Sequence, residues 1–160
     1  MEHLKRDASG TWQFDPYFAY LATIRDRLPA QVYAFASTWD HYALDNPRSL
    51  HDSWLEQIEV REAASGTRSE QRRTEMTLRL LGPMHDRIQV LRYRGVTDYR
   101  MQGTSVARGH GDLLVHELRL SGGDRLVHEL LFANGAEIVV ECGHLDYDEQ
   151  ARPASHPGAA

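Results

Sequence analysis

Large apolar side chains near the N-terminus recur every three or four positions, the spacing of one face of an amphipathic helix: Phe14, Tyr17, Phe18, Leu21, Ile24 and Leu28. Asp15-Pro16 predicts the start of this helix, because an aspartate can accept hydrogen bonds from the first amides and proline suits the first helical position. Leu28-Pro29 predicts its end. A second helix is predicted from Pro29, with an apolar face of Val32, Phe35, Ala36 and Trp39.

Further along the chain the apolar positions alternate with polar ones, which predicts strands. The predicted strands are Trp54–Glu62, Met76–Leu80, Asp86–Tyr93, Asp112–Leu120, Arg125–Ala133 and Ala136–Cys142. The segment from Gly95 to Gly109 is expected to be irregular or a short helical turn. Because the helices precede the strands, we predict an α+β fold, with two N-terminal helices packed on a mostly antiparallel meander sheet of about six strands.

The chain length of 160 residues suits one domain. We expect residues 1–13 to be loose, since they carry few apolar anchors, and residues 14–150 to form the single α+β domain. Residues 151–160 are rich in Ala, Gly and Pro and are expected to be a disordered tail.

Composition limits the compartment and the partners. The single cysteine, Cys142, excludes an intramolecular disulfide and favours a reducing compartment. Neither the apolar run of a signal peptide nor a segment long enough to cross a bilayer is present, so we expect a cytoplasmic protein that does not bind membranes. The net charge of −5 argues against nucleic acid and is compatible with a basic protein partner.

The tetrapeptide Val-His-Glu-Leu occurs twice, at Val115–Leu118 and Val127–Leu130, in neighbouring predicted strands. If Gly122-Gly123 and Asn134-Gly135 form two-residue hairpin turns, Glu117, His128 and Glu141 face one another across three strands. These three residues are a candidate site for a divalent metal, or a histidine whose proton affinity is raised by two acids. The alternative is a ladder of opposite charges that stabilises the sheet. No other cofactor is expected.

Two further groups carry candidate chemistry. Cys142, His144 and Asp146 share one face if the last strand continues past Gly143, and could then form a metal site or an activated thiol. The alternative is a buried cysteine followed by a polar strand exit. The stretch Trp39, Asp40, His41 and Tyr42 falls in a loop and is a candidate binding surface, although the helical pattern favours a core position for Trp39. The whole loop Trp39–Asn46 and the loop Ala63–Arg72 are the candidate contact surfaces.

The segment Ser49–Leu55 carries a Leu-His-Asp motif into the first predicted strand, and Arg94-Gly95-Val96 follows a later one. With the repeated hairpins, this pattern resembles a group of small uncharacterised bacterial α+β proteins, some of which are similar to immunity proteins of bacterial toxin systems. The resemblance covers about the middle half of the chain and carries over no functional residue. It implies a non-enzymatic binding protein.

These observations favour a protein-binding domain, of which an immunity-type protein that neutralises a basic toxin is one form. The alternative is a metal-dependent enzyme or small-ligand-binding protein that uses Glu117, His128 and Glu141. A homodimer formed through a sheet edge is also compatible with the sequence. The sequence leaves open whether the protein catalyses a reaction and favours the view that it does not.

Overall fold

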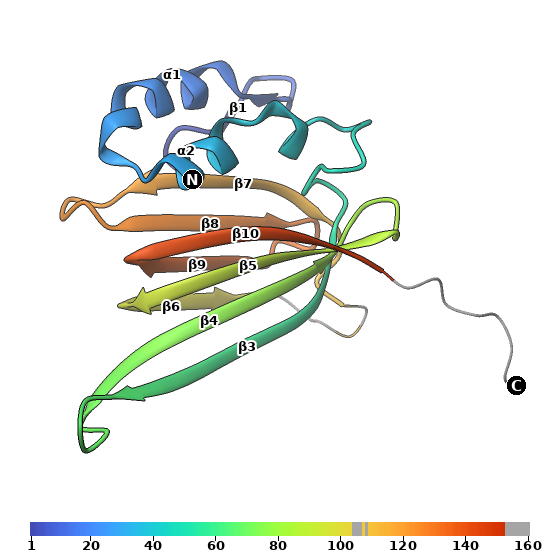
Figure 1. Ribbon diagram of the computed structural model, residues 1–160. Coiled ribbons are helices and arrows are strands. Elements are labelled where there is room, and N and C mark those ends of the chain that lie inside the picture. The colour runs from blue at the N-terminus through green and yellow to red at the C-terminus, as the bar shows by residue number, and fades with distance from the viewer. Residues whose placement is uncertain (104–106, 108, 153–160) are drawn as a thin grey trace, which may run out of the picture.

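The computed structural model describes residues 1–103, 107 and 109–152. The described part of the chain holds a short N-terminal hairpin, two α-helices and two four-stranded antiparallel sheets (Figure 1). The elements are β1 (Lys5–Arg6), β2 (Trp12–Gln13), α1 (Asp15–Ile24), η1 (Arg25–Arg27), α2 (Ala30–Ser37), η2 (Trp39–His41), β3 (Trp54–Ser65), β4 (Gln71–Leu81), β5 (Arg87–Val96), β6 (Asp98–Gln102), β7 (Leu113–Leu120), β8 (Leu126–Phe132), β9 (Glu137–Cys142) and β10 (His144–Ala151).

Both predicted helices form, and the predicted stripes supply their buried residues. Tyr17, Leu21 and Ile24 of α1 are buried, as are Val32, Phe35 and Ala36 of α2. The predicted capping is wrong, because Asp15 lies inside the first turn of α1 and no side chain caps the helix. The second helix also ends earlier than its stripe suggested, since Thr38 adopts an extended conformation and Trp39 begins the 3-10 turn η2.

The strands form two sheets instead of the single six-stranded sheet that the pattern predicted. One sheet has the order β10-β5-β4-β3 and the other β6-β9-β8-β7. Only Thr97 separates β5 from β6, and only Gly143 separates β9 from β10, so both strand pairs bend from one sheet into the other. A register shift opposite Gly95, whose φ is +60°, marks a bulge at this bend. The mostly antiparallel α+β architecture was predicted correctly.

Two strands of these four-stranded sheets were not predicted. β6 lies in the segment expected to be irregular or helical, and all five of its residues are exposed. β10 pairs with β5, so the chain order of neighbouring strands is broken there. Leu145 and Tyr147 alternate with acidic residues along β10, a strand signal that the expected break after Cys142 obscured.

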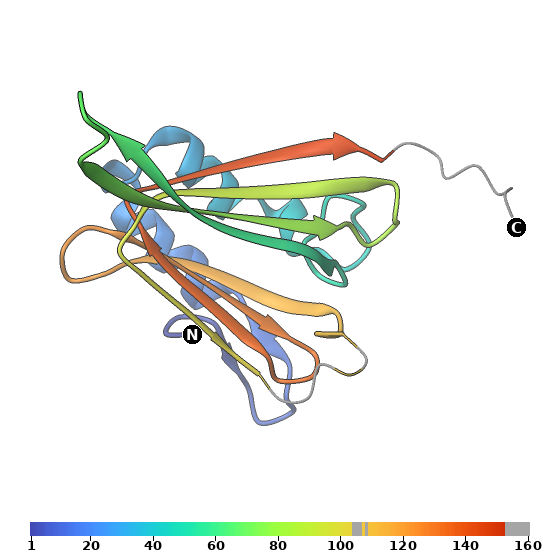
Figure 2. The same ribbon diagram turned by 90° about the horizontal axis from the view of Figure 1, so that it is seen from below.

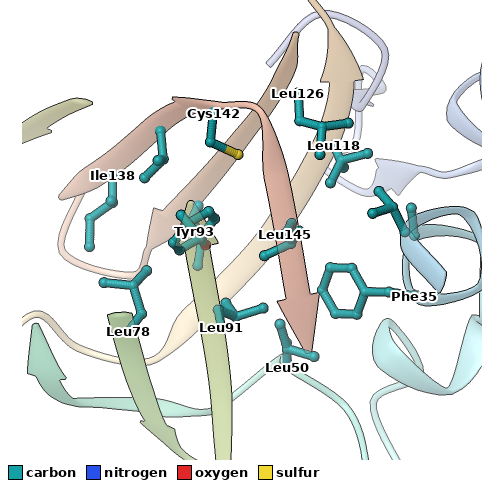
Figure 3. Close-up of a cluster of buried hydrophobic side chains, with 14 of the residues drawn as sticks. Phe35, Leu50, Leu78, Leu91, Tyr93, Leu118, Leu126, Ile138, Cys142 and Leu145 are labelled. Carbon is teal, nitrogen blue, oxygen red and sulfur yellow. The ribbon is translucent and has the colours of Figure 1, made fainter. Parts of the chain in front are cut away.

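The two sheets lie as separate layers in Figure 2, and their facing sides form the main core together with the helices. Figure 3 shows side chains of both sheets in this core, including Leu78 and Tyr93 from one sheet and Ile138 and Cys142 from the other. Phe35 reaches the same core from α2. The face of each sheet that points into this core is called the inner face below.

α1 covers the edge of β7. The backbone N–H of Leu118 donates to the Tyr17 hydroxyl at 2.9 Å, and the N–H of Leu120 donates to the Tyr20 hydroxyl at 2.9 Å. These contacts satisfy two donors that an edge strand would otherwise leave open. The helices thus lie over β7 and β8, on the side of the molecule opposite β3 (Figure 1).

The N-terminal segment, expected to be loose, instead packs on the outer face of the second sheet. Leu4 is buried, and the backbone N–H groups of Glu2, His3 and Leu4 all donate to the Glu117 carboxylate at 2.6–2.8 Å. Of the predicted tail, Ala151 ends β10, and residues 153–160 lie outside the described residues. Among the described residues, no helix has the length and apolar character needed to cross a membrane.

Candidate functional site

The register of the second sheet depends on two hairpin loops that each have three residues instead of the predicted two. Ser121 N–H donates to the Arg125 carbonyl at 2.8 Å, and Phe132 N–H donates to the Ala136 carbonyl at 2.8 Å. The last loop residues, Asp124 and Gly135, take positive φ values of +59° and +82°. This is the geometry of a turn followed by one left-handed residue.

Each extra loop residue shifts the pairing by one position and turns the strand's side chains to the other face. Glu117 therefore pairs with Glu129, and His128 pairs with Leu118 and Val140. The predicted line of Glu117, His128 and Glu141 is wrong, because His128 lies on the inner face while both glutamates lie on the outer face. In the described part of the chain, no three or more His, Cys, Asp and Glu side chains are grouped to hold a metal ion.

The two histidines of the repeated tetrapeptide instead meet on the inner face. His116 Nδ1 lies 3.1 Å from His128 Nε2, and His128 Nδ1 lies 2.8 Å from the Tyr93 hydroxyl. Both imidazoles are buried, and His116 stacks on Tyr42 with ring centroids 4.5 Å apart. We call Tyr93, His128 and His116 the histidine chain.

Two proton assignments satisfy both contacts of the histidine chain with neutral imidazoles. In one, Tyr93 donates to His128 Nδ1 and His128 Nε2–H donates to His116 Nδ1. In the other, both donations run in the opposite direction. His116 Nε2 is buried without a hydrogen-bond partner. Burial lowers the pKa of His128 to about 3 and that of His116 well below its usual value, with the neighbouring His128 lowering the latter further. Both imidazoles are thus neutral and enclosed, which suits a core network better than a general base.

The predicted Cys142 group is divided by the bend at Gly143. Cys142 is buried on the inner face, and burial raises the pKa of its thiol to about 12. His144 and Asp146 lie beyond the bend, where His144 Nε2 is 2.9 Å from Asp146 Oδ1 and Arg94 also contacts Asp146. A protonated, enclosed thiol is a poor nucleophile, so this group contributes packing and an exposed cluster of charges.

The predicted loop surface Trp39–Tyr42 is divided between core and exterior. His41 and Tyr42 are buried, and the Tyr42 hydroxyl donates to the Ala36 carbonyl at 2.8 Å. Trp39 is 53% exposed, so the core position that the helical pattern favoured is wrong. Its ring packs against Phe14 and Phe18, with centroids 5.4 and 6.0 Å away.

Leu44 follows a few residues after Trp39 and is 71% exposed. Ala43 N–H donates to the Trp39 carbonyl at 3.1 Å, so the turn keeps this short segment together. Asp40 and Asp45 directly follow Trp39 and Leu44 in the chain, and among the described residues neither forms an ion pair. We call Trp39, Asp40, Leu44 and Asp45 the Trp39 surface.

The candidate loop Trp39–Asn46 contained Leu44 without naming it, and the sequence did not indicate the histidine chain. Leu44 is a lone leucine in a polar loop, and that context was the available signal for an exposed apolar side chain. The histidine chain depends on the loop lengths, which the residue types did not fix. The other candidate loop, Ala63–Arg72, is shorter than expected, since β3 runs to Ser65 and β4 starts at Gln71.

The chain matches no protein-family model, no curated protein and no solved structure.

Proposed function

We propose that this chain is a non-enzymatic protein-binding domain that contacts its partner through the Trp39 surface. The observation that carries the proposal is the exposure of Trp39 and Leu44 on a short turn whose neighbours, His41 and Tyr42, are firmly buried. An exposed tryptophan on a rigid base supplies a large apolar contact at low entropic cost, as the central residues of protein interfaces do.

The charges around the Trp39 surface favour a basic partner. Asp40 and Asp45 directly follow Trp39 and Leu44 in the chain, and the whole chain carries a net charge of −5. Carboxylates at the rim of an interface speed the encounter with a positively charged protein and disfavour acidic ones.

An immunity-type protein that neutralises a basic toxin is the specific form we propose. Its support is the resemblance of the Leu-His-Asp entry and the repeated hairpins to small bacterial proteins of that kind, together with the acidic surface. In this form the captured partner is itself an enzyme, and the chain inhibits it in equal molar amount.

The proposal is tested by affinity capture from bacterial lysate with the wild-type chain, Trp39→Ala and Trp54→Ala. Trp54 is 50% exposed in β3, so it controls for the loss of a tryptophan elsewhere on the surface. We expect one basic protein in near-equal amount with the wild type and Trp54→Ala, and its loss with Trp39→Ala. If Trp39→Ala captures the partner as well as the wild type does, or if no stoichiometric partner is captured at low salt, the proposal is contradicted.

A second candidate function is the binding of a small polar ligand. A hollow of about 320 Å³ is lined by residues that include Gln31, Phe35, His41, Arg48 and Tyr147. His41 Nδ1 lies 2.8 Å from the Phe35 carbonyl, which makes Nδ1 the donor and leaves buried Nε2 as an acceptor without a partner. A ligand with a hydrogen-bond donor would suit this site. A fragment screen by thermal shift, repeated with His41→Phe, separates it from the first proposal.

A further inference from the structure

β3 is the outermost strand of its sheet, on the side of the molecule away from the helices (Figure 1). It is 12 residues long and pairs with β4 along its inner edge from Trp54 to Ser65. On its other edge, the described residues supply a backbone bridge only at Trp54, which pairs with Asp112. β3 thus offers a long row of open backbone donors and acceptors, whereas α1 covers the edge of β7.

The residues of β3 fall on two faces. Gln57, Glu59, Arg61 and Ala63 pair with outward residues of β4, while Ile58 and Val60 pair with the buried Leu78 and Met76. Val60 is nevertheless 40% exposed at this edge. Charges on an edge strand usually prevent pairing with another chain. Here, however, Glu59 and Arg61 are arranged so that two antiparallel copies of β3 place opposite charges across from each other.

We propose that two copies of this chain pair antiparallel along β3, around a two-fold axis at Val60. In this register Glu59 of each copy faces Arg61 of the other, and the two Val60 side chains face each other. A shift of two residues in one direction would place Glu59 opposite Glu59, and in the other direction Arg61 opposite Arg61. Directly opposed like charges are destabilising in a sheet, so the charges select one register.

Arg61 is already held in position for this contact. Its Nη2 lies 2.6 Å from Glu75 Oε2 on β4. In the dimer each arginine would lie between Glu75 of its own chain and Glu59 of the other copy, so opposite charges alternate across the joined sheets. The antiparallel ladder adds about one backbone hydrogen bond per paired residue. This interface is separate from the Trp39 surface, which follows α2 on the other side of the molecule.

Two single charge reversals test the pairing. Glu59→Arg gives a chain with arginine at both positions, and Arg61→Glu gives a chain with glutamate at both. Each variant alone should place like charges opposite each other and weaken self-association at least about tenfold. An equal mixture restores Arg–Glu pairs at both contacts, so it should form a heterodimer with a Kd within about threefold of the wild type. Sedimentation over a concentration series measures all three samples.

Arg92→Glu is the matched control, because it makes the same reversal on the outward face of β5, away from the edge. It should associate like the wild type. A wild type that stays monomeric at all concentrations, variants that still dimerise alone, or a mixture that stays monomeric would each overturn the proposal. Hydrogen exchange of the wild type supplies a test that needs no variant, since amides of β3 should become more protected as concentration rises. Self-association is read without any partner protein, so its outcome is independent of the capture experiment.

Discussion

At the scale of single residues, the molecule buries the polar groups of both Val-His-Glu-Leu tetrapeptides. His116 and His128 lie in the core as neutral imidazoles, joined to Tyr93 by hydrogen bonds. Glu117 is buried on the opposite face of the sheet, where three backbone N–H groups satisfy its carboxylate. A buried polar group is tolerated only while its hydrogen bonds are made and its charge state suits the core. The stability of the fold should therefore depend on the protonation of the histidines and on the contacts of Glu117.

The buried histidines predict a loss of stability in acid. Burial lowers the pKa values of His41, His116 and His128, so the unfolded chain takes up protons near pH 6.5 that the folded chain does not. The free energy of unfolding should have its full value above about pH 6.5 and decrease as the pH falls toward 3. At pH 5, each deeply buried histidine should lower it by about 2 kcal/mol.

Urea denaturation at pH 7.5 and pH 5 measures this loss. In His128→Gln the difference between the two pH values should be smaller by about 2 kcal/mol. His85→Gln removes a histidine from the exposed turn before β5 and serves as the control. Equal pH dependence in the wild type and His128→Gln would show that His128 does not remain neutral in the fold.

Glu117 predicts a second effect. Replacing it with Gln removes the charge that accepts the N–H groups of Glu2, His3 and Leu4 and turns an amide donor toward them. We expect a loss of about 2–3 kcal/mol, because hydrogen bonds to a buried charge are among the stronger ones. The amides of these residues should also exchange faster. Glu141→Gln, on the same face but partly exposed, is the control, and an equal loss in both variants would contradict the assigned role.

At the scale of elements, residue patterns predicted most strands but not how they pair. Alternation at Ile58 and Val60 and at Met76, Leu78 and Leu80 was sufficient to find β3 and β4. Gly122-Gly123 and Asn134-Gly135 located both hairpins of the second sheet. They did not fix the loop lengths, since each dipeptide fits a three-residue loop as well as a two-residue turn. The one extra residue in each loop determines whether His128 lies next to two glutamates or next to a tyrosine and a histidine.

The loop geometry predicts opposite results for two glycines of these hairpins. Gly135 has a φ of +82°, so Gly135→Ala should cost about 1–2 kcal/mol from backbone strain, although nothing lies within 4 Å of the added Cβ. Gly122 has open space and no positive φ, so Gly122→Ala should change the stability by less than about 0.5 kcal/mol. Thermal denaturation of the two variants measures the difference. An equal loss of stability in the two variants would support two-residue turns instead, because such turns need a positive φ at both glycines.

At the scale of the whole molecule, the bends at Thr97 and Gly143 determine what lies inside and what lies outside. They fold the strands into two layers, enclose the histidine chain and separate Cys142 from His144. Sequence patterns predicted the fold class because periodicity records which face of each element is buried. They placed Trp39 and Asp40 in a candidate surface but favoured a core position for Trp39, because its exposure depends on where α2 ends and how η2 turns. These are properties of the packed molecule.

The proposed role of the Trp39 surface is to bind a basic protein. Calorimetric titration of the purified captured partner with the wild type, Trp39→Ala and Trp54→Ala tests it most directly. We predict that Trp39→Ala weakens binding by about thirtyfold or more, the effect of losing a central interface residue, while Trp54→Ala leaves the Kd within about twofold. If Trp39→Ala binds as tightly as the wild type, or if both variants lose affinity equally, the Trp39 surface is not the binding site.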